Sequence, residues 1–470
     1  MENKRKKTYV EDLDRGIYDR KDEVKYRSKI KGLNEEVIRM ISEEKNEPEW
    51  MLDIRLKALK IFNETPNPVW GPDLSEVDID DIITYIRPDA DLSDTWESVP
   101  DYIRDTFDAL GIQEAEKELF LSGVGAQYDS EVVYHNLQQS LIDQGVIYTD
   151  FETGLKEYED IVKKHYAKAI SPSLHKYAAL HYALSSGGSF IYVPKGVRVD
   201  IPLQSYYRLN APGAGQFEHT LIVVEDDAYC HFIEGCSAPR WNQTNVHAGG
   251  VELYVGKNST LRFSSIENWS RNMYNLNTKR AIVEENGSIQ WVGGSFGSKV
   301  SMLYPTSVLI GEGAKAEMVT ISFGSRGQVI DNGASTIHAA SNTSSNIITK
   351  SISKGGGEAN FRGMVKVLEE AKNCKSTVSC ESLMLDNESR SDTIPYIEVK
   401  NKSCDLGHEA KIGRIDDQVI YYLMTRGFSE EEAKSIVVRG FAEPIAKELP
   451  MEYAVEMNNL INLELEGTIG

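Results

Sequence analysis

The feature of this sequence that most constrains its fold is a short segment that recurs four times between residues 224 and 318. Each copy reads as the end of a strand, a polar turn with Asp, Asn or Gly, a small residue and then an alternating strand. The copies are "VEDDAYCHF" from Val224, "VGKNSTLRF" from Val255, "VEENGSIQW" from Val283 and "IGEGAKAEM" from Ile310, with looser echoes at "IDNGASTIH" and "LDNESRSDT". The spacings are 31, 28 and 27 residues, in the range of stacked-coil architectures.

A unit this short cannot bury its apolar face alone, so neighbouring units must stack. A β-sandwich would not predict repeating turns, and propeller blades usually run to about 40 residues or more. From "SGGSFIYVPKGV" at residue 186 to about residue 402, β-branched and aromatic residues alternate between short Gly, Asn and Asp turns. We therefore predict a mainly β fold in which residues 185–410 form a parallel β-helix.

The flanking regions have helical patterns. In residues 1–184 we expect a helix-rich domain, with a helical stretch over residues 34–65 that breaks at 46–48, and then an extended connector, "TPNPVWGPDLSEVD". Further helices are predicted in "DYIRDTFDALG", "EAEKELFLSG", "EVVYHNLQQSLIDQG" and "LHKYAALHYALSSGG" because each ends at or near Gly.

Residues 411–470 are predicted to form a C-terminal helical domain. Its helices are expected in "GRIDDQVIYYLMTRG", in "SEEEAKSIVVRGF" with a Ser429 and Glu432 capping box, and from Pro450 onwards. Their broad apolar faces either pack on one another or leave one face for a partner, and the sequence leaves both readings open.

The charge balance argues against several partners. The chain of 470 residues has 51 basic and 72 acidic residues, a net charge of -21, which repels nucleic acid and anionic lipid surfaces. It contains no stretch that predicts a membrane span. The basic "KRKK" at 4–7 has no apolar stretch behind it, so we read it as a frayed terminus rather than a signal peptide.

The five cysteines indicate reduced thiols in the cytoplasm rather than a disulfide framework. None forms a C-x-x-C pair, so a bound cluster would need ligands from distant segments. The segment "CDLGHEA" at 404–410 places thiol, carboxylate and imidazole groups together, but Ile412 stands where a zinc-protease helix would have its second histidine. Alone, this segment fits a metal site, a proton relay or a solvated turn.

Several long motifs in one order closely resemble SufB proteins of the SufB/SufD family, the scaffold subunits of the SUF iron-sulfur cluster assembly machinery. The motifs are "LSGVGAQYDSEVVYH", "SGGSFIYVPKGV", "IEGCSAP", "NTKRA", "PYIEVKN" and "LPMEYAVEMNNLINLELEGTIG". The resemblance runs from about residue 30 to the C-terminus. It implies a right-handed parallel β-helix between helical N- and C-terminal domains.

The resemblance also implies a function. Such proteins receive persulfide sulfur from a cysteine desulfurase and its transfer partner, build a transient cluster with iron, here expected to be 4Fe-4S, and pass it to apo iron-sulfur proteins. A separate ABC-type ATPase, SufC, docks on the C-terminal helical domain, and SufD or a second SufB pairs through the β-helix. This sequence has no G-x-x-x-x-G-K-[ST] loop, so we expect no ATP site and no enzyme activity of its own.

The resemblance assigns site residues. Cys236 matches the sulfur acceptor, and Gly235 and Ser237 beside it are expected to leave room for an approaching sulfur. Cys380 matches a second functional cysteine near the face where protomers pair, with His408 and Glu409 as candidate iron or cluster ligands. Because successive strand residues point to opposite sides, one of these two is expected to reach the site only indirectly.

A sulfur path inside the β-helix is also implied. The residues that match it are Arg208, Asn210, Glu267, Trp269 and Lys279. A cation beside a persulfide favours its anionic form, whereas a carboxylate at 267 would repel it, so the role of Glu267 is the least defined.

Three cysteines have no such match. Cys230 and Cys374 are read as packing residues, and the role of Cys404 stays open.

Two other functions are alternatives: a SufD-like subunit that mainly completes a dimer, and a polysaccharide-acting β-helix enzyme, which the absence of a recognisable secretion signal disfavours. The sequence does not distinguish a homodimer from a heterodimer, or identify the iron donor and the electron source.

Overall fold

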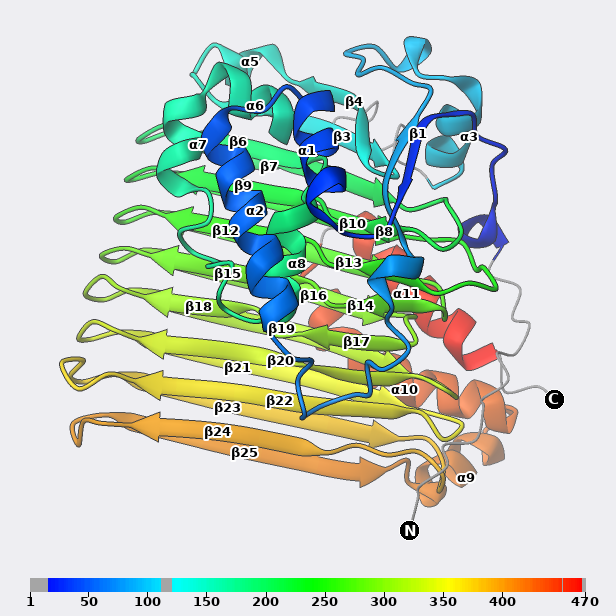
Figure 1. The fold of residues 1–470 in the computed structure, drawn as a ribbon. Coiled ribbons are helices and arrows are strands. Elements are labelled where there is room, and N and C mark those ends of the chain that lie inside the picture. The colour runs from blue at the N-terminus through cyan, green and yellow to red at the C-terminus, as the bar shows by residue number, and fades with distance from the viewer. Residues whose placement is uncertain (1–15, 111–120, 450, 467–470) are drawn as a thin grey trace.

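The computed structural model describes residues 16–110, 121–449 and 451–466. Two long β-sheets face each other, and the chain alternates between them as it winds along the molecule (Figure 1). Within both sheets almost all neighbouring strands are parallel, as a β-helix requires. The predicted mainly β fold, a parallel β-helix flanked by helices, is confirmed.

The first sheet has ten strands. In spatial order they are β25 (Asp405–Arg414), β23 (Lys375–Met384), β21 (Ser344–Ser353), β19 (Lys315–Gly324), β16 (Ser288–Phe296), β13 (Thr260–Asn268), β10 (Tyr229–Ser237), β7 (Arg198–Arg208), β3 (Gly123–Tyr128) and β4 (Glu131–Leu137).

The second sheet has thirteen strands. Its main path is β5 (Ile147–Asp150), β6 (Gly188–Val193), β9 (His219–Val224), β12 (Gly250–Val255), β15 (Thr278–Val283), β18 (Thr306–Leu309), β20 (Val329–His338), β17 (Val300–Leu303), β14 (Met273–Asn275), β11 (Asn245–His247) and β8 (Gly215–Gln216). From β20 the sheet continues through β22 (Glu358–Val367) to β24 (Thr393–Val399).

The recurring sequence segment forms the turn that leads from the second sheet back to the first. One residue in each turn has a left-handed backbone, which Asn, Asp and Gly adopt most readily. The φ angles are 59° at Asp227, 57° at Asn258, 52° at Asn286, 73° at Gly313, 59° at Asn342 and 56° at Asn373. Asn258 Nδ2 donates to Asp227 Oδ1 at 3.0 Å, so neighbouring turns also bond to each other.

Of the two looser echoes, one is a turn and one is not. "LDNESRSDT" leads from β23 into the start of β24, so it is a turn, but it runs from the first sheet to the second, opposite to the recurring turns. "IDNGASTIH" lies inside β20, so the turn predicted there is wrong. Asn332 in this segment uses its side chain within the sheet instead, where Oδ1 accepts a hydrogen bond from the Leu303 N–H at 3.2 Å.

The N-terminal region contributes both helices and strands. Its helices and 3-10 turns are η1 (Gly16–Asp19), α1 (Glu35–Glu44), α2 (Glu49–Glu64), η2 (Ile79–Asp81), η3 (Trp96–Ser98), α3 (Asp101–Ala109), α5 (Gln139–Ile142), α6 (Phe151–Glu157), α7 (Glu159–His165) and α8 (Lys176–Leu184), and β1 (Tyr26–Lys31) pairs antiparallel with β2 (Ile83–Pro88). The predictions of helices around the break at 46–48, in 101–111 and before residue 185 are confirmed.

One predicted N-terminal helix is wrong. Residues 131–137 of the expected helix in 131–145 form β4, and only the four residues of α5 are helical. The reason is tertiary, because β4 pairs antiparallel with β3, which extends the first sheet. The helix predicted in "EAEKELFLSG" lies mostly outside the described residues.

Three C-terminal helices follow the last strand: α9 (Asp417–Thr425), α10 (Glu430–Ala446) and α11 (Met451–Glu466). The capping box of Ser429 and Glu432 is present at the start of α10, as predicted. Apolar residues of α10 and α11 pack with Ile233, Ile266 and Ile321 on the outer face of the ten-stranded sheet. No helix in the described parts of the chain is long and apolar enough to cross a membrane.

Candidate functional site

Cys380 and His408 lie side by side in the last turn of the β-helix. Their strands, β23 and β25, are parallel neighbours, with Cys380 in register with Ala410. Because alternate residues share a face, Cys380 and His408 both point into the interior. Cys380 Sγ lies 3.3 Å from His408 Nε2 and 3.8 Å from Thr393 Oγ1 of the facing sheet.

Glu409 does not join this pair. Its side chain points to the opposite face of β25, is 64% exposed and pairs with Lys411 at 3.2 Å. Only its backbone carbonyl approaches the Cys380 thiol, at 3.6 Å. Of the two adjacent candidate ligands, His408 therefore faces the thiol directly.

The environment of Cys380 favours the protonated thiol over the thiolate, so a base or a metal has to displace its proton. Burial raises its pKa, and the hydrogen bond with Thr393 opposes this. His408 Nε2 is close enough to accept the proton, and thiolate and imidazole are both ligands for iron. Within the described residues, no three His, Cys, Asp or Glu side chains group as a metal site.

Cys236 lies on the interior side of β10, near the end of the strand. Its side chain is buried, and burial together with the carboxylates of Glu234, Glu218 and Glu267 raises its pKa well above the ordinary value. The predicted steric room beside it is not there. A Cβ at Gly235 would lie 2.5 Å from the Tyr206 ring, so this glycine makes room for Tyr206 on the outer face.

A buried ion cluster lies next to Cys236. Lys279, from the facing sheet, places its Nζ 2.5 Å from Glu234 Oε1 and 3.0 Å from Glu267 Oε1. Burial alone would lower the pKa of Lys279, but the two carboxylates outweigh it and raise the pKa. Glu267 is thus held by a cation, which offsets the repulsion that its charge would exert on an anionic sulfur.

A histidine extends this cluster. His247 Nε2 lies 2.5 Å from Glu218 Oε1, and its Nδ1 lies 2.8 Å from Asn275 Oδ1. Burial opposes the charged form of His247, yet Glu218 raises its pKa. The ring of Trp269 packs on His247 at 4.5 Å between centroids, in the same apolar cluster as Cys236.

Arg208 and Asn210 lie elsewhere. Tyr207 is in register with Cys236, so Arg208 points to the opposite, outer face of the sheet. Its Nη1 donates to Ser237 Oγ at 3.0 Å, and Asn210 Nδ2 donates to the Asp22 carbonyl at 3.2 Å. Of the five residues matched to a sulfur path, the structure brings Glu267, Trp269 and Lys279 to Cys236 and places these two outside.

Two interior rows of residues connect the surroundings of Cys236 to Cys380. Both follow the strand register of the first sheet, one strand per step. One row is Glu267, Ser295, Ser322, Ser351 and Ser382, and the other is Ser265, Gly293, Thr320, Thr349 and Cys380. From β10 to β23 there are five steps of about 4.8 Å, so the two thiols are roughly 24 Å apart.

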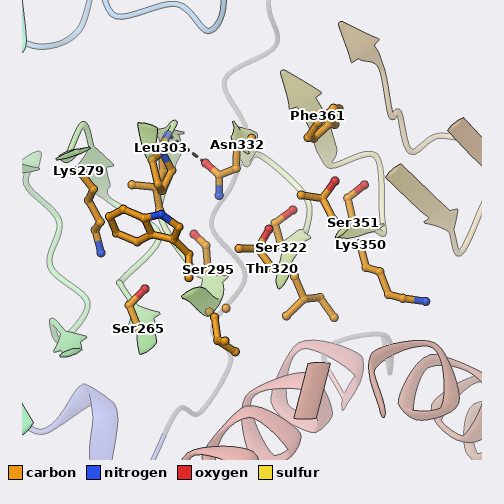
Figure 2. A pocket seen from close by; sticks show the side chains of 18 of the residues that line it. Ser265, Lys279, Ser295, Leu303, Thr320, Ser322, Asn332, Lys350, Ser351 and Phe361 are labelled. Atoms are coloured by element: carbon orange, nitrogen blue, oxygen red, sulfur yellow. Dashed lines mark hydrogen bonds between the residues drawn. The ribbon is translucent and has the colours of Figure 1, made fainter. Parts of the chain in front are cut away.

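A cavity of about 50 Å³ lies along these rows. Figure 2 shows Ser265, Ser295, Thr320, Ser322 and Ser351 around it, with Lys279 toward one side and Phe361 toward the other, while Lys350 points away toward the C-terminal helices. The volume fits a few water-sized groups. Phe361 also stacks on His408, with centroids 6.3 Å apart, so the cavity leads toward the Cys380 pair.

Sequence reasoning missed these hydroxyl residues. Their signal was the repeat itself, because Ser295, Ser322, Ser351 and Ser382 recur at 27, 29 and 31 residues, the spacing of the turns. Extending the turn register into the strands would have identified them.

The remaining cysteines are distributed as follows. Cys230 is buried in the apolar interior with Phe232. Cys374 accepts a hydrogen bond from Thr343 Oγ1 at 3.3 Å and packs beside Cys404.

Comparison with known proteins gives matches over most of the chain. Residues 207–441 match the family model for the SUF system FeS cluster assembly, SufBD core domain, and residues 125–205 match that for the SufBD protein N-terminal region. An iron-sulfur cluster assembly SufBD family protein of Staphylococcus aureus strain MRSA252 is 50% identical over 461 residues, 98% of both chains. One of Staphylococcus haemolyticus strain JCSC1435 is 51% identical over 440 residues, 94% of both chains.

Proposed function

The chain belongs to the SufBD family of iron-sulfur cluster assembly proteins, and we propose that within this family it is the SufB-type scaffold. In this role Cys236 accepts persulfide sulfur, and Cys380 with His408 holds iron and sulfur as a transient cluster. The cluster is the cargo of the protein, destined for apo iron-sulfur proteins, and not a resident cofactor.

The observation that carries this proposal is the contact between Cys380 and His408, 3.3 Å apart, at one end of the interior rows of hydroxyl residues that start on the strand beside Cys236. A thiol and an imidazole give mixed ligation, which retains a cluster less firmly than four thiolates do. Two protein ligands leave other coordination positions for sulfide and for ligands from a partner.

The last strands support pairing with SufD or with a second copy of this chain. In the described structure β24 and β25 end their sheets, so each has an unpaired edge close to Cys380. Ile394, Tyr396, Ile397 and Val399 of β24 are exposed. A partner that covers this edge would lie against the Cys380 and His408 pair.

The C-terminal helices support docking of a SufC-type ATPase. Their exposed apolar residues are Val419, Tyr421, Tyr422, Met424, Phe428 and Ile436 of α9, α10 and the turn between them. In this proposal the chain hydrolyses no ATP itself, works in the cytoplasm with a cysteine desulfurase and its transfer partner as sulfur source, and transmits the effect of ATP binding by its partner.

Reconstitution tests the proposal. The purified chain with iron, a persulfide source and SufC should develop an iron-sulfur chromophore, and Cys380→Ala and His408→Ala should each abolish most of it. Glu409→Ala is the matched control, because its side chain faces away from the thiol, and it should keep the chromophore. Full chromophore in both the Cys380 and the His408 variant would reject the proposed site.

A SufD-like subunit is the second candidate, and the burial of Cys236 with a raised pKa favours it, since a protonated, enclosed thiol is a poor sulfur acceptor. Persulfide labelling mapped by mass spectrometry separates the two functions. Sulfur on Cys236 supports the SufB-type role, whereas sulfur only on Cys230 or Cys374 would count against the assignment of Cys236.

A further inference from the structure

Residues 18–26, which we call the N-terminal strap, lie across the ends of β7 and β10. In Figure 1 this dark blue segment lies at the right-hand ends of these strands, far in sequence from both. It makes specific contacts with the ends of three strands, as follows.

The first contact is with Arg208, whose side chain is fully buried. Its Nη2 donates to the carbonyl of Tyr18 at 3.0 Å and to that of Arg20 at 2.8 Å. Its partners among the described residues are thus two carbonyls and the Ser237 hydroxyl, and its buried Nε has none. A buried guanidinium without a direct carboxylate partner is a group suited to bind an anion.

The second contact is with the end of β3 and with α3. Asp22 Oδ2 accepts hydrogen bonds from Tyr128 at 2.8 Å and from Thr106 at 2.6 Å. The Asp22 backbone bonds in both directions with the side chain of Asn210. Asp22 is therefore the residue that fastens the middle of the strap.

The third contact is with the segment after β10. Asp19 Oδ1 accepts a hydrogen bond from the Arg240 N–H at 2.9 Å, four residues beyond Cys236. At the other end of the strap, Tyr26 packs against the apolar cluster that contains Cys236 and Trp269. Tyr26 also donates to Asp129 Oδ2 at 3.1 Å, so the strap is held at both ends.

We propose that the strap is a removable cover, and that the persulfide-carrying protein which supplies sulfur docks on the surface that the strap occupies, with Arg208 as the anion-binding group that it uncovers. This inference rests on the proposed function, because it assumes that Cys236 accepts sulfur. It accounts for the packing of Tyr26 against the apolar cluster that contains Cys236. It also gives Arg208, which lies outside the interior, a role in the same process.

The transfer step needs no oxidant or reductant. The Cys236 sulfur attacks the outer sulfur of the donor persulfide, a new S–S bond forms at Cys236, and the S–S bond of the donor breaks. The donor cysteine leaves as a thiolate and takes up the proton that Cys236 loses. With the strap displaced, Arg208 is free to bind the anionic persulfide of the donor during docking.

Alkylation of the full-length chain tests the cover. Iodoacetamide should modify Cys236 about tenfold faster in Asp22→Ala than in wild type, because each lost buried hydrogen bond favours opening several-fold. Asp91→Ala is the matched control, since Asp91 is 74% exposed and bonds to Arg27, outside the strap contacts described above. Cys230 is the internal control, and its rate should not change.

Two results would overturn the proposal. One is an equal rate of Cys236 alkylation in Asp22→Ala, Asp91→Ala and wild type. The other is a parallel rise in the alkylation rate of Cys230 in Asp22→Ala, which would mean general unfolding. If Asp22→Ala does not fold, hydrogen exchange of the wild type decides. A persulfide-loaded cysteine desulfurase should speed exchange in residues 18–26, and unchanged exchange while Cys236 gains sulfur would also reject the cover. A faster Cys236 alkylation without sulfur uptake from glutathione persulfide would instead reject the proposed function alone.

Discussion

At the scale of single residues, charge burial near Cys236 is the most consequential feature. Lys279 is nearly fully enclosed, yet it stays charged because Glu234 and Glu267 contact it from the facing sheet. A buried ion pair adds little net stability when complete, but removing one partner leaves an uncompensated charge. The cluster therefore keeps charged groups next to the Cys236 thiol, and the protein is strongly destabilised if one of these groups is lost.

Lys279→Met should lower the free energy of unfolding by about 3 to 5 kcal/mol, because it leaves two buried carboxylates without their cation. Denaturant unfolding measures this. Lys257→Met is the control, since Lys257 pairs with Glu285 at 3.2 Å on an exposed turn and its loss should leave the free energy of unfolding almost unchanged. An equal loss of unfolding free energy in the two variants would mean that the fold does not depend on the charge of Lys279.

The buried carboxyl group of Asp129 should make the stability of the protein depend on pH. Burial raises its pKa to about 6, although the N–H groups of Asn210 and Ala211 oppose this. Since the folded pKa lies above the unfolded value of 3.8, the folded state holds the proton longer, and stability falls as pH rises from about 4 to about 6. The full penalty, about 3 kcal/mol, then persists at neutral pH.

Asp129→Asn removes this ionisation, so the difference in unfolding free energy between wild type and variant should shift in favour of the variant between pH 4 and pH 6 and stay constant above. Denaturant midpoints at pH 4, 5, 6 and 7 measure it. A difference that does not change with pH would show that Asp129 keeps an ordinary pKa in the folded protein.

At the scale of elements, the turns explain why the sequence repeat was visible. The left-handed residue must be Asn, Asp or Gly in every turn, and Gly313 replaces Asn because a Cβ there would lie 2.4 Å from Asn286 Oδ1. Backbone geometry thus imposes a residue type at a nearly constant interval. Strand interiors carry no such restriction, so only the turns repeat clearly.

Asn286→Ala should destabilise the protein by about 1 kcal/mol, because alanine lacks the side chain that eases a left-handed backbone. Asn286→Gly should be close to neutral, since glycine adopts a φ of 52° without a Cβ. Thermal or denaturant midpoints compare the two. A larger loss in the glycine variant would mean that side-chain bonds between turns, rather than backbone conformation, select asparagine.

At the scale of the whole molecule, the β-helix connects two thiols that lie roughly 24 Å apart across five strand steps. The interior cavity occupies part of the space between them, and Ser295 lines it with a hydroxyl that has no hydrogen-bond partner in the described structure. Replacing this side chain therefore changes the cavity without breaking a described hydrogen bond.

Ser295→Leu should block passage through the interior. Sulfur should still load on Cys236 while arrival at Cys380 falls by at least about tenfold, because the larger side chain fills much of the cavity. Mass spectrometry of both cysteines after persulfide treatment measures this. Ser295→Ala, which removes the hydroxyl without filling space, should keep transfer. Equal transfer in both variants would show that sulfur does not use this route.

The sequence by itself determined the β-helix, most of the helices around it and the membership in the family, because these depend on local backbone rules and on motifs that recur or persist in order. It did not determine that 131–137 is a strand, since only pairing with β3 makes it one. Nor did it separate Glu409 from His408, or place Arg208 outside the interior beneath residues 18–26. These facts depend on which face each residue occupies and on contacts between segments as far as 190 positions apart, which only the tertiary structure decides.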